Sequence, residues 1–329
     1  NQGTYQKPSK ITLGEWLDTW LETYVASLVK PYTENSYRSI CKNHIKPAIG
    51  AVKLERLEVT QIQQLYNRLQ REDGLSAKTI KNVHGVLHRA LDRAVKIKLI
   101  RDNPSDLCEL PKVQRKEIVP LEQEQIAALL QELHGEPYEN VYLVTLFTGL
   151  RQGEVLGLTW DCVDFERNTI YVSKQLQKDQ KAKGVYQLVP TKNSRSRQIV
   201  VASSVMTYLK RQRAKQAQMQ LLAGSAWENK DNLVFTNEIG GHLVHVTVYK
   251  HFKAIVRKMG LEHTRFHDLR HSYAVAAIES GDDIKTVQSN LGHASAAFTL
   301  NVYAHATQRM KRRSAEHMEH YIQEVSGNA

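Results

Sequence analysis

Three prolines between residues 103 and 120 divide this chain of 329 residues into two parts, and the division limits the folds open to it. The segment NPSDLCELPKVQRKEIVP combines those prolines with mixed charges, a composition typical of a linker. The chain on each side is long enough to bury a core of its own. We therefore expect these parts: a polar tail (1–10), a helical domain (11–104), a linker (105–120), a second domain (121–305) and a C-terminal helix or tail (306–329).

Residues 11–100 have the spacing of amphipathic helices. In TLGEWLDTWLETYV, apolar residues recur every three or four positions after Thr12, which is a favourable N-cap. Three more such segments follow: TENSYRSICKNHIKPAIG after Thr33, TQIQQLYNRLQ after Thr60, and SAKTIKNVHGVLHRALDRAVKIKLI after Ser76. The pattern predicts a small domain of four helices.

The charge of the chain is unevenly distributed. The formal net charge is +11, and residues 1–116 contain 20 Lys and Arg against 12 Asp and Glu. This excess favours a polyanionic partner over the first domain. Its last helix has a basic side, which we expect to lie against a DNA backbone, the alternative being a merely solvated face. The expected DNA-contacting residues on that helix are Lys78, Lys81, Arg89, Arg93 and Lys96.

The second domain mixes helices with a short β region. It opens with the helical segments LEQEQIAALLQEL and ENVYLVTLFTGLRQGEVLGL, and helical patterns return after residue 203. Between them lie NTIYVSK, VYQLVPTK and RQIVVAS, which are rich in β-branched residues. The sequence thus predicts a mainly α protein with a small antiparallel β-sheet. The basic stretch 174–191 is expected to form an extended hairpin or insertion that follows DNA.

Cysteine usage and hydropathy narrow the setting of the protein. The three cysteines are widely spaced and form no Cys-x-x-Cys motif, which favours a reducing cytoplasm. We find no apolar run long enough for a membrane span and no signal peptide. Because the chain starts with Asn1, we expect it to be a fragment or a processed form.

The segment FHDLRHSYA concentrates chemistry in one place. His267, Arg270 and His271 share one face of the expected helix, and such a face suits a metal or an anion. His263, His267 and His271 have a spacing compatible with zinc. Because no cysteine accompanies them and no His-Glu-x-x-His motif occurs, we expect no metal.

Arg151 is a second candidate for anion binding. It stands at the start of a helix, and Glu154 lies three residues later, where its carboxylate can hold the guanidinium. Arg151 and Arg270 together could clamp one phosphodiester and neutralise charge in its transition state. Taken alone, Arg151 is equally compatible with a surface ion pair.

Lys192 and Tyr303 are weaker candidates when taken singly. Lys192 is expected at the tip of a β-hairpin, where it could act as a general acid, the alternative being a solvated lysine. Tyr303 is an ordinary packing residue unless its neighbours activate a phosphate, because a tyrosine with a pKa near 10 is a poor nucleophile.

Taken in order, these residues resemble a known family. The sequence contains Arg151, Lys192, HDLRH (267–271), LGH (291–293) and YAH (303–305). This order resembles the tyrosine recombinase (phage-type integrase) family, and most closely the integrases of conjugative transposons from Gram-positive bacteria. The resemblance implies a SAM-like core-binding domain and an α+β catalytic domain that form a clamp around DNA.

The resemblance also implies roles for individual residues. Tyr303 would attack a DNA phosphodiester to form a 3′-phosphotyrosine, and Lys192 would protonate the leaving 5′-oxygen. The groups that would hold or support the phosphate are Arg151, Arg270, His267 (acid–base support) and His293, with Glu154 and His271 as supporting residues and Arg195 and Arg197 as further DNA contacts.

The family implies partners but no cofactor. A recombinase of this kind excises and inserts a mobile element through a Holliday junction, as a dimer on each site and a tetramer in synapsis. It works in the bacterial cytoplasm with an excisionase and DNA-bending proteins. Such proteins often carry an N-terminal arm-binding domain, which we expect to be missing from this sequence. The alternatives are a topoisomerase of type IB, an architectural DNA-binding protein and a zinc-dependent nuclease.

Overall fold

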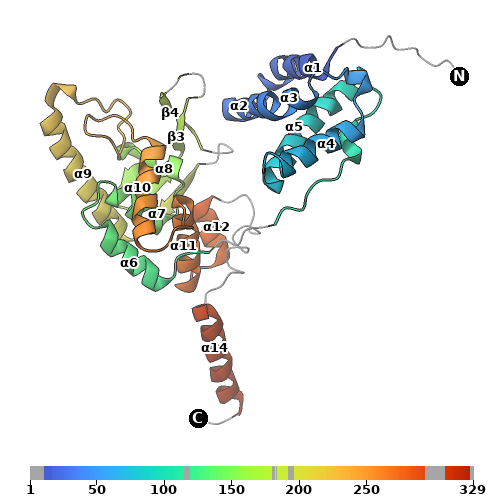
Figure 1. Cartoon of the computed structure of the whole chain (residues 1–329). Helices are drawn as coiled ribbons and strands as arrows, with labels where there is room; N and C mark the ends of the chain where they lie inside the picture. The colour runs from blue at the N-terminus through green and yellow to red at the C-terminus, as the bar shows by residue number, and fades with distance from the viewer. Residues whose placement is uncertain are drawn as a thin grey trace. The chain divides into compact units, whose positions relative to one another are not determined.

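A computed structural model describes residues 11–114, 119–179, 182, 184–191, 196–292 and 308–326 (Figure 1). The chain divides into two compact units, residues 1–116 and 117–329. None of the helices in these described ranges is both long enough and apolar enough to cross a bilayer.

The described part of the first unit is helical. Its elements are α1 (Leu13–Trp20), the π-helical turn η1 (Leu21–Val25), α2 (Pro31–Ile40), the π-helical turn η2 (Cys41–Ile45), α3 (Lys46–Ile49), the 3₁₀ turn η3 (Leu54–Arg56), α4 (Val59–Arg71), α5 (Ala77–Lys96) and the 3₁₀ turn η4 (Pro104–Leu107). Because α1 continues into η1, and α2 continues through η2 into α3, these elements form four continuous helical segments. The predicted four-helix domain is confirmed.

Two of the predicted helix starts are confirmed by their caps. The Thr12 hydroxyl accepts a hydrogen bond from the Glu15 N–H (3.2 Å), and the Glu15 carboxylate accepts one from the Thr12 N–H (2.8 Å). This reciprocal pair satisfies two amides that the first helical turn leaves free. Ser76 caps α5 with a single bond of this kind, in which its hydroxyl accepts the N–H of Thr79.

The other two predicted N-caps, Thr33 and Thr60, are wrong by three and two residues, because the structure has Lys30 and Glu58 at these positions. Helix α2 begins at Pro31, two residues before Thr33, because proline at the first helical position has a suitable φ and needs no N–H partner. Helix α4 begins at Val59 with Glu58 as its N-cap, so Thr60 lies inside the helix.

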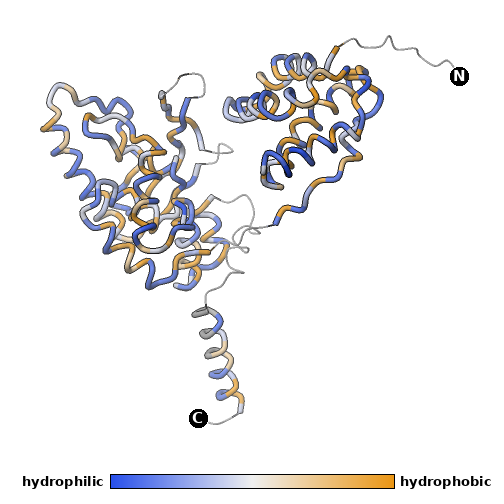
Figure 2. The backbone as a smooth tube through the Cα atoms, in the orientation of Figure 1, coloured by the Kyte–Doolittle hydropathy of each residue, from blue (hydrophilic) through white to orange (hydrophobic). Residues whose placement is uncertain are grey.

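Aromatic residues organise the core of the first unit. Trp16 is 1% exposed, and its indole N–H donates a hydrogen bond of 2.9 Å to the carbonyl of Ala90 in α5. Trp20 stacks on Tyr37, which joins α1 to α2. The tube of this unit alternates between hydrophobic and hydrophilic colours along each helix (Figure 2), as expected for helices that pack on one face.

The second unit combines helices with short strands. Its described elements are α6 (Gln123–Leu133), α7 (Glu139–Thr148), α8 (Gln152–Leu156), the 3₁₀ turn η5 (Trp160–Cys162), β1 (Val163–Asp164), β2 (Thr169–Val172), β3 (Lys174–Lys178), β4 (Tyr186–Pro190), β5 (Arg197–Val200), α9 (Ser203–Ala223), the 3₁₀ turn η7 (Gly224–Ala226), α10 (His245–Lys258), α11 (Phe266–Glu279), α12 (Ile284–Leu291) and α14 (Gln308–Ser326). The predicted mainly helical class with small antiparallel sheets is therefore confirmed.

The strands form two antiparallel sheets. One has the order β1-β2-β5 and pairs Ile170 with Ile199, and the other is the β3–β4 hairpin. The hairpin predicted for the stretch 174–191 is thus present. Lys192, predicted at a hairpin tip, lies outside the described residues; the strands before and after it, β4 and β5, belong to different sheets.

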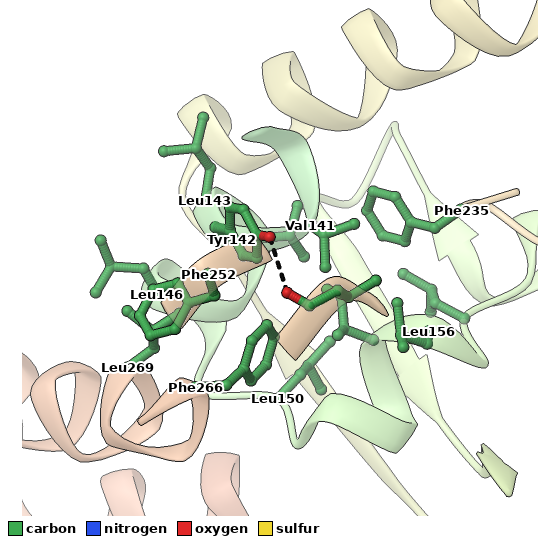
Figure 3. Packing of buried hydrophobic residues seen from close by; sticks show 14 of the residues in the cluster. Val141, Tyr142, Leu143, Leu146, Leu150, Leu156, Phe235, Phe252, Phe266 and Leu269 are labelled. Atoms are coloured by element: carbon green, nitrogen blue, oxygen red, sulfur yellow. Dashed lines mark hydrogen bonds between the residues drawn. The ribbon is translucent and has the colours of Figure 1, made fainter. Parts of the chain in front are cut away.

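The core of the second unit surrounds Tyr142 on α7. Its ring packs against Phe252 of α10 and Phe266 of α11. Its hydroxyl lies 3.0 Å from the carbonyl of Val248, to which it donates the hydrogen bond drawn in Figure 3. This packing holds α7 against α10 and the start of α11. Arg151 comes three residues after the end of α7, and His267 lies in the first turn of α11.

Both ends of the predicted linker are tied to their neighbouring units. The Gln63 side chain of α4 accepts a hydrogen bond from the Glu109 N–H (2.8 Å), so the chain up to residue 109 is attached to the first unit. On the other side, the Leu121 N–H donates to the Ser272 hydroxyl of α11 (2.8 Å).

Candidate active site

Arg151 occupies the N-cap position of α8, where the sequence predicted the start of a helix. One nitrogen of its guanidinium donates to Glu154 Oε1 at 2.7 Å, and its backbone N–H donates to Glu154 Oε2 at 3.0 Å. The Arg151 side chain is 28% exposed. Glu154 therefore fixes both the backbone and the guanidinium of Arg151, while part of that guanidinium stays accessible to a ligand.

Glu154 is a buried carboxylate between two arginines. Its side chain is 1% exposed, and Arg197 binds it with two nitrogens at 2.8 and 3.1 Å. Burial alone would raise the pKa of Glu154, but hydrogen bonds and charge from Arg197, and then the charge of Arg151, lower it to about 2. Glu154 is therefore ionised at every pH at which the protein would work.

Arg270 lies on α11 and is 1% exposed. Its two terminal nitrogens donate to the carbonyls of Gly149 and Leu291, each at 2.6 Å. Gly149 has the left-handed φ of +66° that ends α7, and this conformation directs its carbonyl toward Arg270. Neutral carbonyls orient the guanidinium without cancelling its charge.

The C-terminus of α12 is a common anchor for three arginines. The carbonyls of Asn290, Leu291 and Gly292 accept hydrogen bonds from Arg197 (2.6 Å), Arg270 (2.6 Å) and Arg151 (3.4 Å), respectively. The end of a helix presents free carbonyls and the negative end of its dipole, which suits cations. Helix α12 thus gathers guanidinium groups from three separate segments of the chain.

The positive charge of this cluster exceeds its negative charge. Arg151, Arg197 and Arg270 share the single carboxylate of Glu154. Burial, and then the charge of Arg151, lower the pKa of Arg270 to about 9, so the group stays charged at neutral pH. Among the described residues its terminal nitrogens donate to carbonyls and not to a carboxylate. An excess of fixed positive charge in a partly buried site is the arrangement expected for an anion such as a phosphodiester.

His267 and His271 are neutral groups beside this cluster. Their rings meet edge to face with centroids 4.9 Å apart. Burial, and then His267, lower the pKa of His271 to about 4. Loss of water around the ring, and then the charge of Arg270, also lower the pKa of His267, although solvent screens part of the effect at this exposed residue. Each neutral ring has one nitrogen that donates and one that accepts.

Helix α8 packs directly on the β3–β4 hairpin. A Cβ at Gly157 would lie 2.4 Å from the backbone nitrogen of Leu176, and one at Gly153 would lie 3.1 Å from the Leu176 carbonyl. Only glycine permits this approach between helix and strand. The base of the hairpin is therefore part of the support for Arg151.

Four of the predicted site residues, Lys192, Arg195, His293 and Tyr303, lie outside the described residues. Lys192 and Arg195 fall between β4 and β5, and His293 comes directly after the α12 anchor. Among the residues that the structure does describe, no three His, Cys, Asp or Glu side chains gather in a way that would hold a metal ion.

Arg197, which the sequence predicted as a DNA contact, binds partners within the protein in this structure. Its side chain is 9% exposed and is occupied by Glu154 and Asn290, so it faces into the protein. Strand alternation could have indicated this, because Arg197 lies on the same face of β5 as the buried Ile199.

The basic residues predicted on α5 lie in the first unit. Lys78, Lys81, Arg89 and Lys96 are exposed. Arg93 is half-buried, with its guanidinium 4.6 Å from the centre of the Tyr24 ring. Packing on that ring preorganises Arg93.

Comparisons with known proteins agree with this geometry. Residues 120–310 match the model of the phage integrase family, and residues 12–70 match that of the phage integrase N-terminal SAM-like domain. A protein of Caldanaerobacter subterraneus subsp. tengcongensis described as tyrosine recombinase XerC-like is 32% identical over 326 residues, an alignment that covers 93% of this chain and 82% of that protein.

Solved structures share the fold. The Tn1549 transposon integrase in complex with a circular intermediate DNA has a TM-score of 0.76 and 24% identity, over 94% of this chain and 99% of that one. A lambda integrase tetramer bound to a Holliday junction has a TM-score of 0.65 and 20% identity, over 88% and 78% of the two chains. On the family match and the 32% identical relative, the chain belongs to the phage integrase family of tyrosine recombinases, enzymes that exchange DNA strands.

Proposed function

We propose that the protein is a site-specific recombinase that excises and inserts a conjugative transposon. The observation that carries the proposal is the arginine anchor at the end of α12. Arg270 and Arg151 bind the carbonyls of Leu291 and Gly292, immediately before His293 and the segment that leads to Tyr303. Two oriented guanidinium groups thus bind the residues that directly precede, in the sequence, the segment with the proposed nucleophile.

The proposed chemistry is a metal-independent transesterification. The Tyr303 oxygen attacks the scissile phosphorus, the bond to the 5′-oxygen breaks, and Lys192 donates a proton to that oxygen. Arg151 and Arg270 bind the non-bridging oxygens and stabilise the charge that develops on them. The phosphotyrosine retains the energy of the broken bond, so the 5′-hydroxyl of a second strand can reverse the step.

The histidines would complete this site. A neutral His267 can accept the tyrosine proton, which fits the lowering of its pKa beside Arg270. His293 would donate a hydrogen bond to the phosphate. Glu154 and the buried His271 would act in support, by holding Arg151 and by packing against His267.

DNA binding would involve both units. We propose that the exposed basic residues of α5, with Arg195, neutralise backbone phosphates, and that the two units form a clamp around the duplex. We also propose that the β3–β4 hairpin follows the DNA, because it is basic and its base supports α8. If deletion of residues 177–184 left both DNA cleavage and DNA bending unchanged, this role of the hairpin would be rejected.

Recombination requires more than one subunit. By analogy with the lambda integrase tetramer on a Holliday junction, we propose a dimer on each site and a tetramer in synapsis. Helix α14 presents exposed apolar side chains, among them Tyr321 (57% exposed) and Val325 (65% exposed), which would suit docking on a neighbouring protomer. An excisionase and DNA-bending proteins would take part, in the bacterial cytoplasm where the DNA lies.

A covalent-trapping assay tests the proposed chemistry. The substrate is a nicked duplex with the end sequence of the element, from which the cleaved fragment diffuses away, and the buffer contains EDTA. The wild type should form an adduct that survives denaturation, and Tyr303→Phe should form none while its DNA affinity stays unchanged.

The other outcomes separate the alternatives. Intact DNA binding without an adduct in the wild type would favour an architectural protein, and dependence of cleavage on metal would favour a zinc nuclease. An adduct without strand exchange between two duplexes would favour a topoisomerase of type IB.

A further inference from the structure

Arg197 connects the two segments that hold the phosphate-binding arginines. It is the first residue of β5, and its side chain is 9% exposed. Its Nε donates to the Asn290 carbonyl at 2.6 Å, and its two terminal nitrogens donate to the two oxygens of Glu154 at 3.1 and 2.8 Å. All three nitrogens of Arg197 are therefore used inside the protein.

Toward α8, Arg197 fixes the carboxylate that holds Arg151. The bidentate interaction of Arg197 with Glu154 sets the plane of the carboxylate, because a guanidinium and a carboxylate pair in one plane. The same two oxygens then accept the guanidinium of Arg151 (2.7 Å) and its backbone N–H (3.0 Å). The position of Arg151 thus depends on Arg197 indirectly, because each of the two arginines bonds to Glu154 and none of these bonds joins one arginine to the other.

Toward α12, Arg197 fixes the end of the helix. Its bond to the Asn290 carbonyl lies one residue before Leu291, whose carbonyl orients Arg270. Gly292 follows with a left-handed φ of +63°, and a Cβ there would lie 3.2 Å from Cδ of Arg197. The turn into His293 is therefore built against the Arg197 side chain.

We propose that Arg197 is a positioning residue that makes no contact with DNA and holds Arg151, through Glu154, and the α12 turn, through Asn290, in place for the scissile phosphate. This inference rests on the recombinase function proposed above. Under this proposal Arg197 affects the rate of strand cleavage and does not affect the affinity for DNA.

The two roles predict different measurements. A phosphate contact that is lost weakens binding and reduces the salt dependence of binding by about one unit of slope. A positioning residue that is lost leaves binding and its salt dependence unchanged but lowers the rate of cleavage at saturating protein. Displacement of a reacting group by about 1 Å costs on the order of 100-fold in rate.

The experiment compares Arg197→Gln and Arg197→Lys with Arg167→Gln. Arg167 is the matched control, because its side chain is 81% exposed and pairs with Asp164 on the surface, at 3.5 Å. We expect Arg197→Gln to form the adduct on the nicked duplex at least about 30-fold more slowly than the wild type, within the range of such displacements. Arg197→Lys should recover only part of this rate, because an ammonium cannot reproduce the planar, paired donors of a guanidinium.

A neutral substrate separates positioning from general damage. A methylphosphonate at the scissile position carries no charge, so the arginines contribute less to its cleavage. If Arg197 acts through Arg151, the defects of Arg197→Gln and Arg151→Gln should shrink together on this substrate. An equal defect of Arg197→Gln on both substrates would overturn the proposal, as would a loss of affinity and salt slope with a normal rate at saturation.

Two further arms keep the test decisive. If Arg197→Gln does not fold, the double variant Glu154→Gln/Arg197→Gln replaces the ion pair by neutral side chains of similar shape. A wild-type cleavage rate in that variant would refute the proposed role. Failure of the wild type itself to form an adduct would instead count against the recombinase function.

Discussion

Replacement of Gly149 by alanine should damage both the stability of the second unit and its active site. Gly149 ends α7 with a φ of +66°, and a Cβ there would lie 2.5 Å from both Cδ2 of Leu291 and Cδ1 of Tyr273. The left-handed backbone costs a residue with a Cβ about 1–2 kcal/mol. The clash adds about 1–3 kcal/mol, because Leu291 is fully buried and the tyrosine ring is rigid.

Gly135→Ala is the matched control for this prediction. Gly135 lies in the same unit with a φ of +77°, but a Cβ there would have no atom within 4 Å. The free energy of unfolding, measured by urea titration with circular dichroism, should fall by about 1–2 kcal/mol in Gly135→Ala. In Gly149→Ala it should fall by about 2–5 kcal/mol, the sum of the two effects.

Activity gives a second measurement of the same effect. The carbonyls of Gly149 and Leu291 are the two that orient Arg270. A clash between these residues moves both, so the rate of covalent adduct formation should fall at least tenfold in Gly149→Ala and stay unchanged in Gly135→Ala. Equal unfolding free energies for the two variants, within about 0.5 kcal/mol, would refute the reasoning from close packing.

Three more predictions follow from other contacts. Glu154→Gln should lower the free energy of unfolding at pH 7 by about 3 kcal/mol. The pKa of this carboxyl is lowered from 4.5 to about 2, so its contribution is present above pH 4.5 and is lost as the pH falls through about 2. Lys78→Gln and Lys81→Gln should each reduce the slope of log affinity against log salt by about 1 in DNA-binding titrations, with sequence preference unchanged. Trp16→Phe should cost about 1–2 kcal/mol in thermal melts, through the lost bond to the Ala90 carbonyl and a small cavity.

Each of these predictions has its own control. For Glu154→Gln, the difference in the free energy of unfolding from the wild type should narrow below pH 4.5. A difference that stays constant down to pH 3 would contradict the conclusion that the ionised Glu154 carboxylate stabilises the fold. Lys230→Gln changes a lysine that is 79% exposed in the second unit and pairs with Glu228, so a similar loss of salt slope there would remove the special role of α5. For Trp16→Phe, an unchanged melting temperature would show that the indole bond adds nothing to stability.

Local features of the chain were predictable because their causes lie close together in the sequence. Thr12 and Glu15 form their capping pair across three residues, and Glu154 holds Arg151 across the same separation. The helical spacing of apolar residues predicted four helices in the first unit, and the order of motifs predicted the family. The starts of α2 and α4 were predicted too late, at Thr33 and Thr60. Residues just upstream also favour a helix start: Pro31 at the first helical position and Glu58 as an N-cap.

The role of Arg197 was decided only by tertiary structure. Its partners, Glu154 and Asn290, lie 43 and 93 residues away in the chain, so strand alternation could indicate the face of β5 on which Arg197 lies but not the groups that it binds. The same holds for Arg270, because the two carbonyls that accept its hydrogen bonds, those of Gly149 and Leu291, lie 121 and 21 residues away. Sequence by itself determined the helices, the order of the chemical groups and the excess of positive charge. Only the folded chain decided that Arg197 pairs with the buried carboxylate of Glu154 while Arg270 binds neutral carbonyls, because these partners come from segments that are far apart in the sequence.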